Sequence, residues 1–257
     1  MLILYHDWDS LQSMKTRMCL AHKGLPFQGR LVALTSFEHL RAPFLAINPV
    51  GLVPVLQDGP WTLRESSVIN EYLEDRSPSE LRPAEPGLRA RMRLWTKLQD
   101  EEVHPAIRPA TFQLMIRPRL ASLTDDALEA LIASHPLPAR AAAFRGWARG
   151  DIDWDVLRDA VGRLGRIVHS LEATLTHSTW LAGDALSLAD IAFASFVDRV
   201  EHLGLAWLWH DAPGVRRWAA AIRSLRSYQD AVCPEEHRLP APPATAVAEM
   251  ERRFRTT

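Results

Sequence analysis

The sequence has few cysteines, no excess of either charge and no long apolar run. Cys19 and Cys233, its only cysteines, are too few and too far apart for a disulfide framework or a paired-cysteine zinc motif. Thirty Lys and Arg against 31 Asp and Glu leave a net charge of -1, which disfavours nucleic-acid binding. No apolar run reaches the roughly 18 residues of a membrane span, and the first residues do not form a secretory signal. We therefore expect a cytoplasmic protein that binds neither nucleic acid nor membrane.

Several catalytic motifs are also missing. The sequence has no glycine-rich phosphate loop, no Gly-x-Ser-x-Gly elbow and no His-Glu-x-x-His, and its ten histidines are scattered without ligand spacing. We therefore expect no metal and no nucleotide. The 257 residues, 47% hydrophobic and 24% charged, are typical of a globular protein with one or two cores.

Residues 1–80 alternate short β-type runs with helical spacing. The patterns predict strands at residues 2–5 and 27–34, a hairpin of 53–57 with 61–63, and helices at 13–23, 40–47 and 66–75. A strand, a helix and a strand in series imply a parallel pair, and the hairpin adds antiparallel strands. The first domain is thus predicted to be a small mixed sheet with helices.

After a proline-rich linker, the remaining patterns are helical. Helices are predicted at residues 89–103, 125–134, 154–175, 187–203 and 215–225, which makes residues 87–232 an all-α bundle. Ser187 and Asp190 fit a helix capping box, a structural role. Residues 233–257 are expected to form an extended tail with one short helix.

Two serines lie where the first helix begins. The hydroxyl of Ser10 or Ser13 can cap this helix, and it can equally donate to an anion that the helix N-terminus attracts. If the anion is a thiolate, the donated hydrogen bond lowers the pKa of that thiol. On this segment alone the capping interpretation is favoured.

Two further segments have both a structural and a functional interpretation. Pro54 heads a strand that is central to the predicted sheet, which is unusual unless the Val53-Pro54 bond is cis and the Val53 backbone faces a ligand. The alternative is an ordinary proline that leads from a loop into the strand. Glu65 and Ser66 open the third helix. They form either an N-cap or a site in which helix amides hold a carboxylate while Glu65 meets an ammonium.

Taken together, these pieces resemble the cytosolic glutathione transferases. The resemblance covers about residues 2–230 and implies an α+β thioredoxin-like domain at residues 1–80, which binds glutathione, followed by an all-α bundle at 87–232. In this resemblance the Val53 backbone pairs with the peptide of glutathione beside cis Pro54, and Glu65 and Ser66 hold its γ-glutamyl end. His39 would lie near the glycine carboxylate, where Leu52 replaces a lysine of many theta-class members.

Within the family, two related groups share further segments with this chain. Residues 13–17 and 188–204 resemble the tetrachlorohydroquinone reductive dehalogenases, whereas residues 47–51, 71–84 and an insertion near 105–153 resemble the bacterial β-aryl etherases. The dehalogenases have a catalytic cysteine at the position of Gln12, and the etherases have an asparagine there. Without that thiol a mixed disulfide with glutathione cannot be resolved, which disfavours dehalogenase chemistry.

The resemblance therefore predicts a serine-type glutathione S-transferase. Ser13 or Ser10, with Ser13 slightly preferred, would ionise glutathione, which attacks a small aromatic or ether electrophile, including β-aryl ethers. The alternatives are a glutathione-dependent dehalogenase or isomerase, and a non-catalytic binding module. The resemblance also implies a cytoplasmic homodimer that acts in detoxification or aromatic catabolism.

Overall fold

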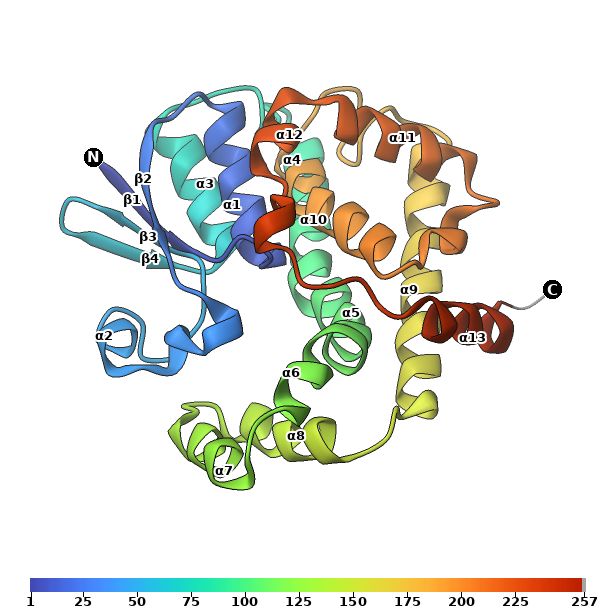
Figure 1. The fold of residues 1–257 in the computed structure, drawn as a ribbon. Coiled ribbons are helices and arrows are strands. Elements are labelled where there is room, and N and C mark those ends of the chain that lie inside the picture. The colour runs from blue at the N-terminus through green and yellow to red at the C-terminus, as the bar shows by residue number, and fades with distance from the viewer. Residues whose placement is uncertain (256–257) are drawn as a thin grey trace.

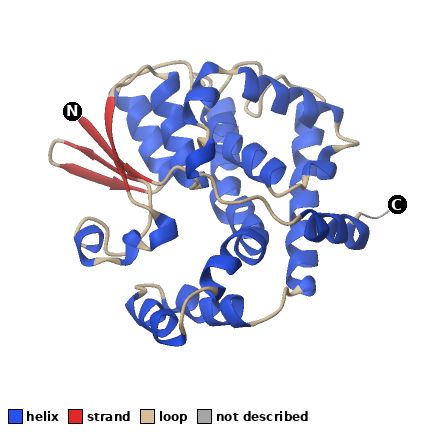
Figure 2. Cartoon of the chain, viewed as in Figure 1, coloured by secondary structure: helices blue, strands red, loops and turns tan. Residues whose placement is uncertain are grey.

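A four-stranded sheet lies at one end of the protein, and helices make up the rest (Figures 1 and 2). This computed structural model describes residues 1–255, except for the side chains of residues 139 and 140. The strands, in the spatial order β2-β1-β3-β4, are β1 (Leu2–His6), β2 (Phe27–Leu31), β3 (Val55–Asp58) and β4 (Trp61–Arg64). β1 and β2 are parallel, and β3 is antiparallel to both β1 and β4. The predicted parallel pair and terminal hairpin are thus confirmed.

Alternation along β1 places different side chains on the two faces of the sheet. Leu2 and Leu4 are buried in the main core, which also receives α1 (Leu11–His22) and α3 (Ser66–Arg76). Tyr5 lies in a second, smaller cluster, and its ring is 6.3 Å from that of Phe44. α1 ends just before Gly24, whose φ of 61° suits a glycine that stops a helix.

The segment between β2 and β3 differs from the prediction. β2 ends at Leu31, not near Leu34, because the backbone amides after Val32 leave the sheet: Ala33 N donates to the Glu38 carboxylate and Leu34 N to that of Asp7. The predicted helix at 40–47 is reduced to one turn. The short helices here are η1 (Leu34–Ser36), η2 (Glu38–Leu40) and α2 (Ala42–Leu45).

A nearly continuous helical run begins the second part of the chain. It consists of α4 (Pro86–Leu98), the π-turn η3 (Gln99–Val103), α5 (His104–Thr111), the π-turn η4 (Phe112–Ile116) and α6 (Arg117–Ala121). The predicted helix at 89–103 therefore continues beyond its expected end, although Pro109 lies inside α5. The two π-turns keep the run helical around the prolines.

The remaining helices complete the bundle and match the predicted ones closely where both exist. They are α7 (Asp125–Ser134), α8 (Pro138–Arg149), α9 (Trp154–Leu175), α10 (Leu188–His202), η5 (Ala206–Trp209), α11 (Pro213–Ser224) and α12 (Arg226–Ala231). The sequence patterns did not predict α5, α6, α8 or α12. Proline and alanine-rich stretches obscured the apolar spacing of these segments.

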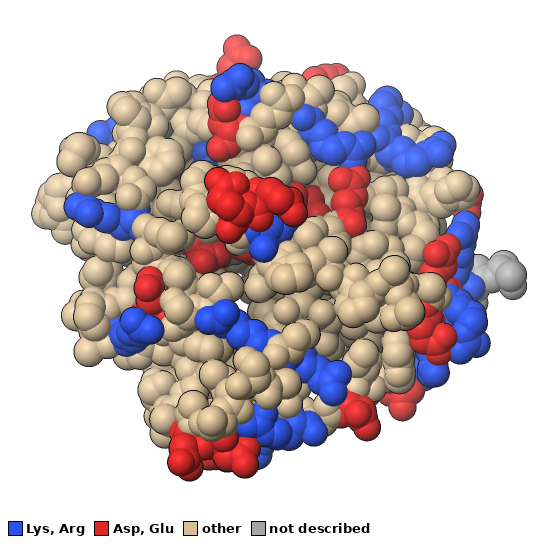
Figure 3. All heavy atoms as spheres, viewed as in Figure 1, with Lys and Arg blue, Asp and Glu red and all other residues tan. Residues whose placement is uncertain are grey.

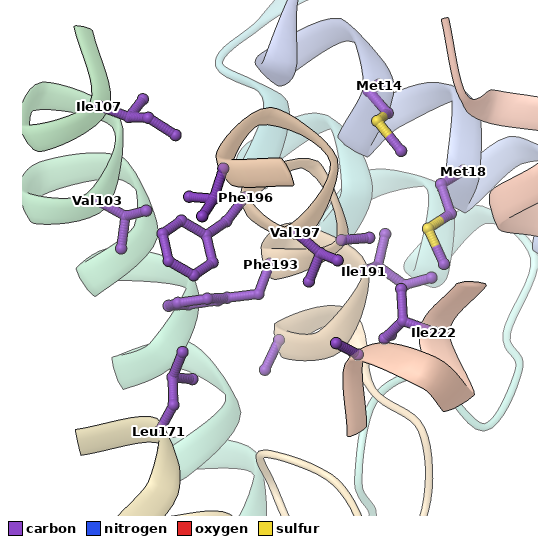
Figure 4. Packing of buried hydrophobic residues seen from close by; sticks show 14 of the residues in the cluster. Met14, Met18, Val103, Ile107, Leu171, Ile191, Phe193, Phe196, Val197 and Ile222 are labelled. Atoms are coloured by element: carbon purple, nitrogen blue, oxygen red, sulfur yellow. The ribbon is translucent and has the colours of Figure 1, made fainter. Parts of the chain in front are cut away.

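The central helix α10 joins the two parts of the molecule. Figure 4 shows Phe193 and Phe196 pointing toward the helix that carries Val103, while Ile191 points toward Met18 of α1. The predicted capping box is present at its start, since Ser187 N donates to Asp190 at 2.9 Å. A continuous apolar core therefore fixes the sheet against the bundle.

The carboxyl-terminal segment returns across the junction between the two parts (Figure 1). It contains η6 (Glu235–His237) and α13 (Ala244–Phe254), and α13 packs on α9. Leu239 N donates to the Asp9 carboxylate at 3.0 Å. Residues 256 and 257 of the predicted tail lie outside the described residues. The domain boundaries at 1–80 and 87–232 stay predictions.

Candidate functional site

A cavity of about 430 Å³ opens between the sheet and the bundle. Eight of the nine residues predicted from the sequence line it: Ser10, Gln12, His39, Leu52, Val53, Pro54, Glu65 and Ser66. Ser13 is not among the lining residues. Within residues 1–255, no cluster of three His, Cys, Asp or Glu side chains could hold a metal ion, and no helix is long and apolar enough to cross a membrane.

Two buried arginines hold the loop between β1 and α1. The Arg17 guanidinium donates to Asp7 O and Trp8 O, both at 2.8 Å, and lies over the Trp8 ring. Burial lowers the pKa of Arg17 to about 10. Arg199 of α10 donates to the backbone oxygen of Asp9 at 2.6 Å and to its carboxylate at 2.7 Å. This loop, which leads directly into Ser10, is therefore fixed by side chains from two different helices.

The two candidate serines occupy different environments. Ser10 is the N-cap of α1, its hydroxyl oxygen accepts a hydrogen bond from Ser13 N at 3.2 Å, and it lines the cavity. No acceptor for the Ser10 hydroxyl hydrogen occurs within residues 1–255, so this hydroxyl can cap the helix and still donate into the cavity. Ser13 is fully buried, and its hydroxyl oxygen accepts from Asp7 N at 3.4 Å. This placement does not favour the predicted preference for Ser13.

A buried lysine links α1 to the start of the bundle. Lys15 is fully buried, and its ammonium donates to Ser67 at 3.0 Å, to Gln99 at 2.8 Å and to Asp100 at 2.7 Å. Burial lowers the pKa of Lys15, and the Asp100 carboxylate opposes that shift. Asp100 also accepts from the Gln12 amide at 3.5 Å. The Gln12 side chain thus lies in the cavity wall at the end of this network.

The segment before β3 lines the cavity with Leu52, Val53 and Pro54. The Val53-Pro54 peptide bond is cis, as the first of the two sequence interpretations required. Asn48 is buried, and its side-chain amide donates to Leu52 O at 2.7 Å. Gly51 has a φ of 62°, and a Cβ there would lie 2.9 Å from His39 O. Only glycine fits this close approach, which brings the Leu52 and His39 segments together.

The N-terminus of α3 faces the same cavity. Its N-cap, Glu65, has a φ of 67°, an unusual value for a residue with a side chain. The Glu65 side chain makes no capping hydrogen bond to the helix amides. Ser66 donates to the Gln12 side-chain oxygen at 3.1 Å. The positive end of the α3 dipole and its first amides therefore face a space that can receive a carboxylate.

The part of the cavity that the bundle forms is aromatic and basic. Its walls include Phe112 and Phe144, whose ring centroids are 6.3 Å apart, and Phe37 of the first domain lies 6.4 Å from Phe144. Arg108 on α5 places its guanidinium carbon 5.2 Å from the Phe112 ring centroid. Arg119 on α6, together with His104 and His135, also lines this part.

Several charged residues in or beside the cavity were not among the predicted site residues. Asp7 and Asp9 follow a buried strand, a position that is typical of site residues in sheet proteins. Lys15 and Arg199 are charged residues within otherwise buried stretches of helix, which is a detectable signal for paired interior charges. Asp100 carried no such signal, because it follows several exposed charges along α4.

A thioredoxin-like sheet joined to a helical bundle, with a cavity at the junction, defines a class of two-domain proteins. Comparison with known proteins identifies the class. The family model "Glutathione S-transferase, N-terminal domain" matches residues 4–83, and "Glutathione S-transferase, C-terminal domain" matches residues 110–225. The chain belongs to the glutathione S-transferase family.

Individual relatives agree with this assignment. The protein LigF of Sphingobium sp. strain SYK-6 is 33% identical over 207 residues, which cover 79% of this chain and 80% of LigF. The crystal structure of the beta-etherase LigF superposes with a TM-score of 0.83 at 30% identity, covering 90% of this chain and 98% of LigF. Glutathione S-transferase 3 of Zea mays is 30% identical over 234 residues, which cover 88% and 90% of the two chains. The predicted fold class, family and enzyme class are thereby confirmed.

Proposed function

We propose that this glutathione transferase binds glutathione in the described cavity as a thiolate, held by the Ser10 hydroxyl. The observation that carries the proposal is the position of Ser10. Ser10 lines the cavity at the start of α1, and its hydroxyl hydrogen has no acceptor within residues 1–255. A hydroxyl donor and a helix N-terminus both stabilise an anion, so they lower the pKa of a thiol from about 8.5. Ser13 would instead stabilise the loop between β1 and α1, since its hydroxyl oxygen accepts from Asp7 N.

The other lining residues match the rest of the tripeptide. The cis Val53-Pro54 segment offers backbone groups to the cysteinyl peptide, as the family resemblance implies. The amides at the start of α3, with Glu65 and Ser66, would hold the carboxylate and ammonium of the γ-glutamyl end. His39 would lie near the glycine carboxylate, beside Leu52.

The reaction requires only positioning and ionisation. The thiolate sulfur attacks a carbon of the electrophile, a carbon–sulfur bond forms, and the bond to the leaving group breaks. With a β-aryl ether the leaving group is a phenolate, which takes a proton from water. Holding both reactants in one cavity supplies the orientation, and the Ser10 hydroxyl favours the reactive thiolate.

Cleavage of a β-aryl ether is the substrate assignment that we propose for this reaction. It is supported by the likeness to LigF, which is described as a beta-etherase. Incubation with glutathione and a model β-aryl ether should release the phenol. No release, together with turnover of a chlorinated nitrobenzene, would leave a transferase with another substrate.

The cysteines do not support the dehalogenase alternative. Gln12 occupies the position of the dehalogenase cysteine, and neither Cys19 nor Cys233 lines the cavity. Burial raises the pKa of each of these thiols to about 12, so both are protonated near neutral pH. A non-catalytic module would bind glutathione without turnover, and an isomerase would return it unchanged. Product analysis therefore separates these alternatives.

We also propose a cytoplasmic homodimer with a role in detoxification or aromatic catabolism. These assignments come from the resemblance to the family. Sedimentation of the purified protein tests the dimer, which requires twice the mass of one 29.0 kDa chain.

A further inference from the structure

The cavity has an uneven distribution of charge that the tripeptide does not account for. Its four lining carboxylates belong to Asp7, Asp9, Glu65 and Asp100, on the side of α1 and α3. Within the described residues, the lining contributed by positions 104–144 contains no carboxylate. That part instead contains the arginines of α5 and α6 and two histidines, so its potential is positive.

Arg119 differs from the other arginines of this region. Arg145 pairs with Glu129, Arg149 pairs with Asp125, and Arg117 donates to a backbone oxygen at the end of α8. Among the residues whose side chains the structure describes, Arg119 has no such acceptor, although it lines the cavity. In Figure 3, Lys and Arg side chains gather in the lower middle of the face, about where Figure 1 places α6 and α8.

The same part of the cavity provides a surface for an aromatic ring. Phe112 and Phe144 form one wall, and Phe37 closes it from the first domain. Arg108 already lies over the Phe112 ring, 5.2 Å from its centroid, which places one cation at the edge of this wall. An aromatic ring stacked here would lie in the same part of the cavity that Arg119 lines.

We infer that the electrophile is an aromatic compound that carries a carboxylate, which Arg119 and Arg108 bind in the part of the cavity that α5, α6 and α8 line. The planar guanidinium offers paired donors that match a carboxylate. This inference rests on the proposed function, because it assigns the substrate class of the same site. Since Arg119 is exposed, its contribution is screened by solvent and salt.

Two glutathione conjugates that differ by one group test this assignment. S-(4-carboxybenzyl)glutathione and S-benzylglutathione are titrated into the 257-residue protein by calorimetry, at low and at high salt. We expect the carboxylate conjugate to bind about five- to tenfold more tightly at low salt, in the range of one exposed charge-assisted contact. The preference should decrease at high salt.

Three variants show which residue produces the preference. Arg119→Gln should reduce it to about twofold or less, whereas Arg119→Lys should retain part of it because the charge remains. Arg145→Gln is the matched control, because its exposed pair with Glu129 lies outside the cavity lining. It should leave both affinities unchanged.

The outcomes distinguish this inference from the proposed function. Equal binding of both conjugates by the unchanged protein would overturn the assigned substrate class and leave glutathione binding intact. The assigned substrate class would also be overturned if Arg119→Gln kept the full preference for the carboxylate conjugate, as Arg145→Gln is expected to do. If neither conjugate bound, both the substrate class and the proposed function would be wrong.

Discussion

Replacing Arg199 by Met tests the interaction that fixes the loop before Ser10. Arg199 is 2% exposed, and it makes two short hydrogen bonds to Asp9, one to the backbone oxygen and one to the carboxylate. The substitution removes the cation and leaves the Asp9 carboxylate buried without its charge partner. Breaking a buried pair in this way costs about 3–5 kcal/mol, and we expect the free energy of unfolding to fall by that amount.

Urea unfolding measures this loss, and two further variants interpret it. Arg145→Met removes an exposed ion pair and should cost about 1 kcal/mol or less. The double variant Asp9→Asn with Arg199→Met has no uncompensated charge, so it should be more stable than Arg199→Met alone. A loss for Arg199→Met no larger than that of Arg145→Met would refute the reasoning. Weaker glutathione binding is also expected, because the loop leads into Ser10.

Two other perturbations test the packing near the site. Gly51→Ala places a Cβ 2.9 Å from His39 O at a φ of 62°, so thermal unfolding should show a loss of about 1–3 kcal/mol and calorimetry a weaker glutathione affinity. An unchanged glutathione affinity in Gly51→Ala would show that the turn at Gly51 does not shape the binding site. Burial lowers the pKa of His6 to about 4, so its contribution to stability is complete above about pH 6.5 and is lost as the pH falls toward 4. His6→Gln should abolish up to about 3 kcal/mol of this pH dependence in urea titrations, and an identical pH profile would contradict it.

The strength of the hydrophobic periodicity determined which parts of the fold could be predicted from the sequence. The predicted limits of α7 and α9 coincide with those in the structure, because their apolar positions recur regularly between clear polar ends. α5 and α8 were missed because their prolines and alanines hide that spacing. The one-turn helix α2 was overestimated, since a few apolar residues at helical spacing do not establish its length.

The site was partly predictable for a related reason. Val53-Pro54 and Glu65-Ser66 are local signals, and the family resemblance placed them in one candidate site; both pairs line the cavity. The slight preference for Ser13 had little support in the sequence, because which serine lines the cavity depends on how the loop is anchored. That anchoring comes from Arg199, which is 190 positions away from Asp9 in the chain.

The distal part of the cavity shows the limit of sequence reasoning. Arg108 and Arg119 are individually ordinary charged residues on amphipathic helices. Their significance comes from the absence of carboxylates around them in the described cavity wall, which depends on how α5, α6 and α8 pack. Such an arrangement has no signature in residue spacing.

The pKa of the glutathione thiol in the bound complex tests the central proposal most directly. Thiolate absorbance is followed against pH on protein that is saturated with glutathione. Saturation is needed because Ser10→Ala also removes a helix cap, which costs about 1 kcal/mol of stability and must not be mistaken for a change in the thiol pKa. We expect a bound thiol pKa well below about 8.5 in the unchanged protein. Ser10→Ala should raise the pKa of the bound thiol by about 1, equivalent to about 1.4 kcal/mol, and Ser13→Ala should change this pKa less. An unchanged thiol pKa in Ser10→Ala would contradict the proposal, and a larger rise in Ser13→Ala would assign the contact to Ser13.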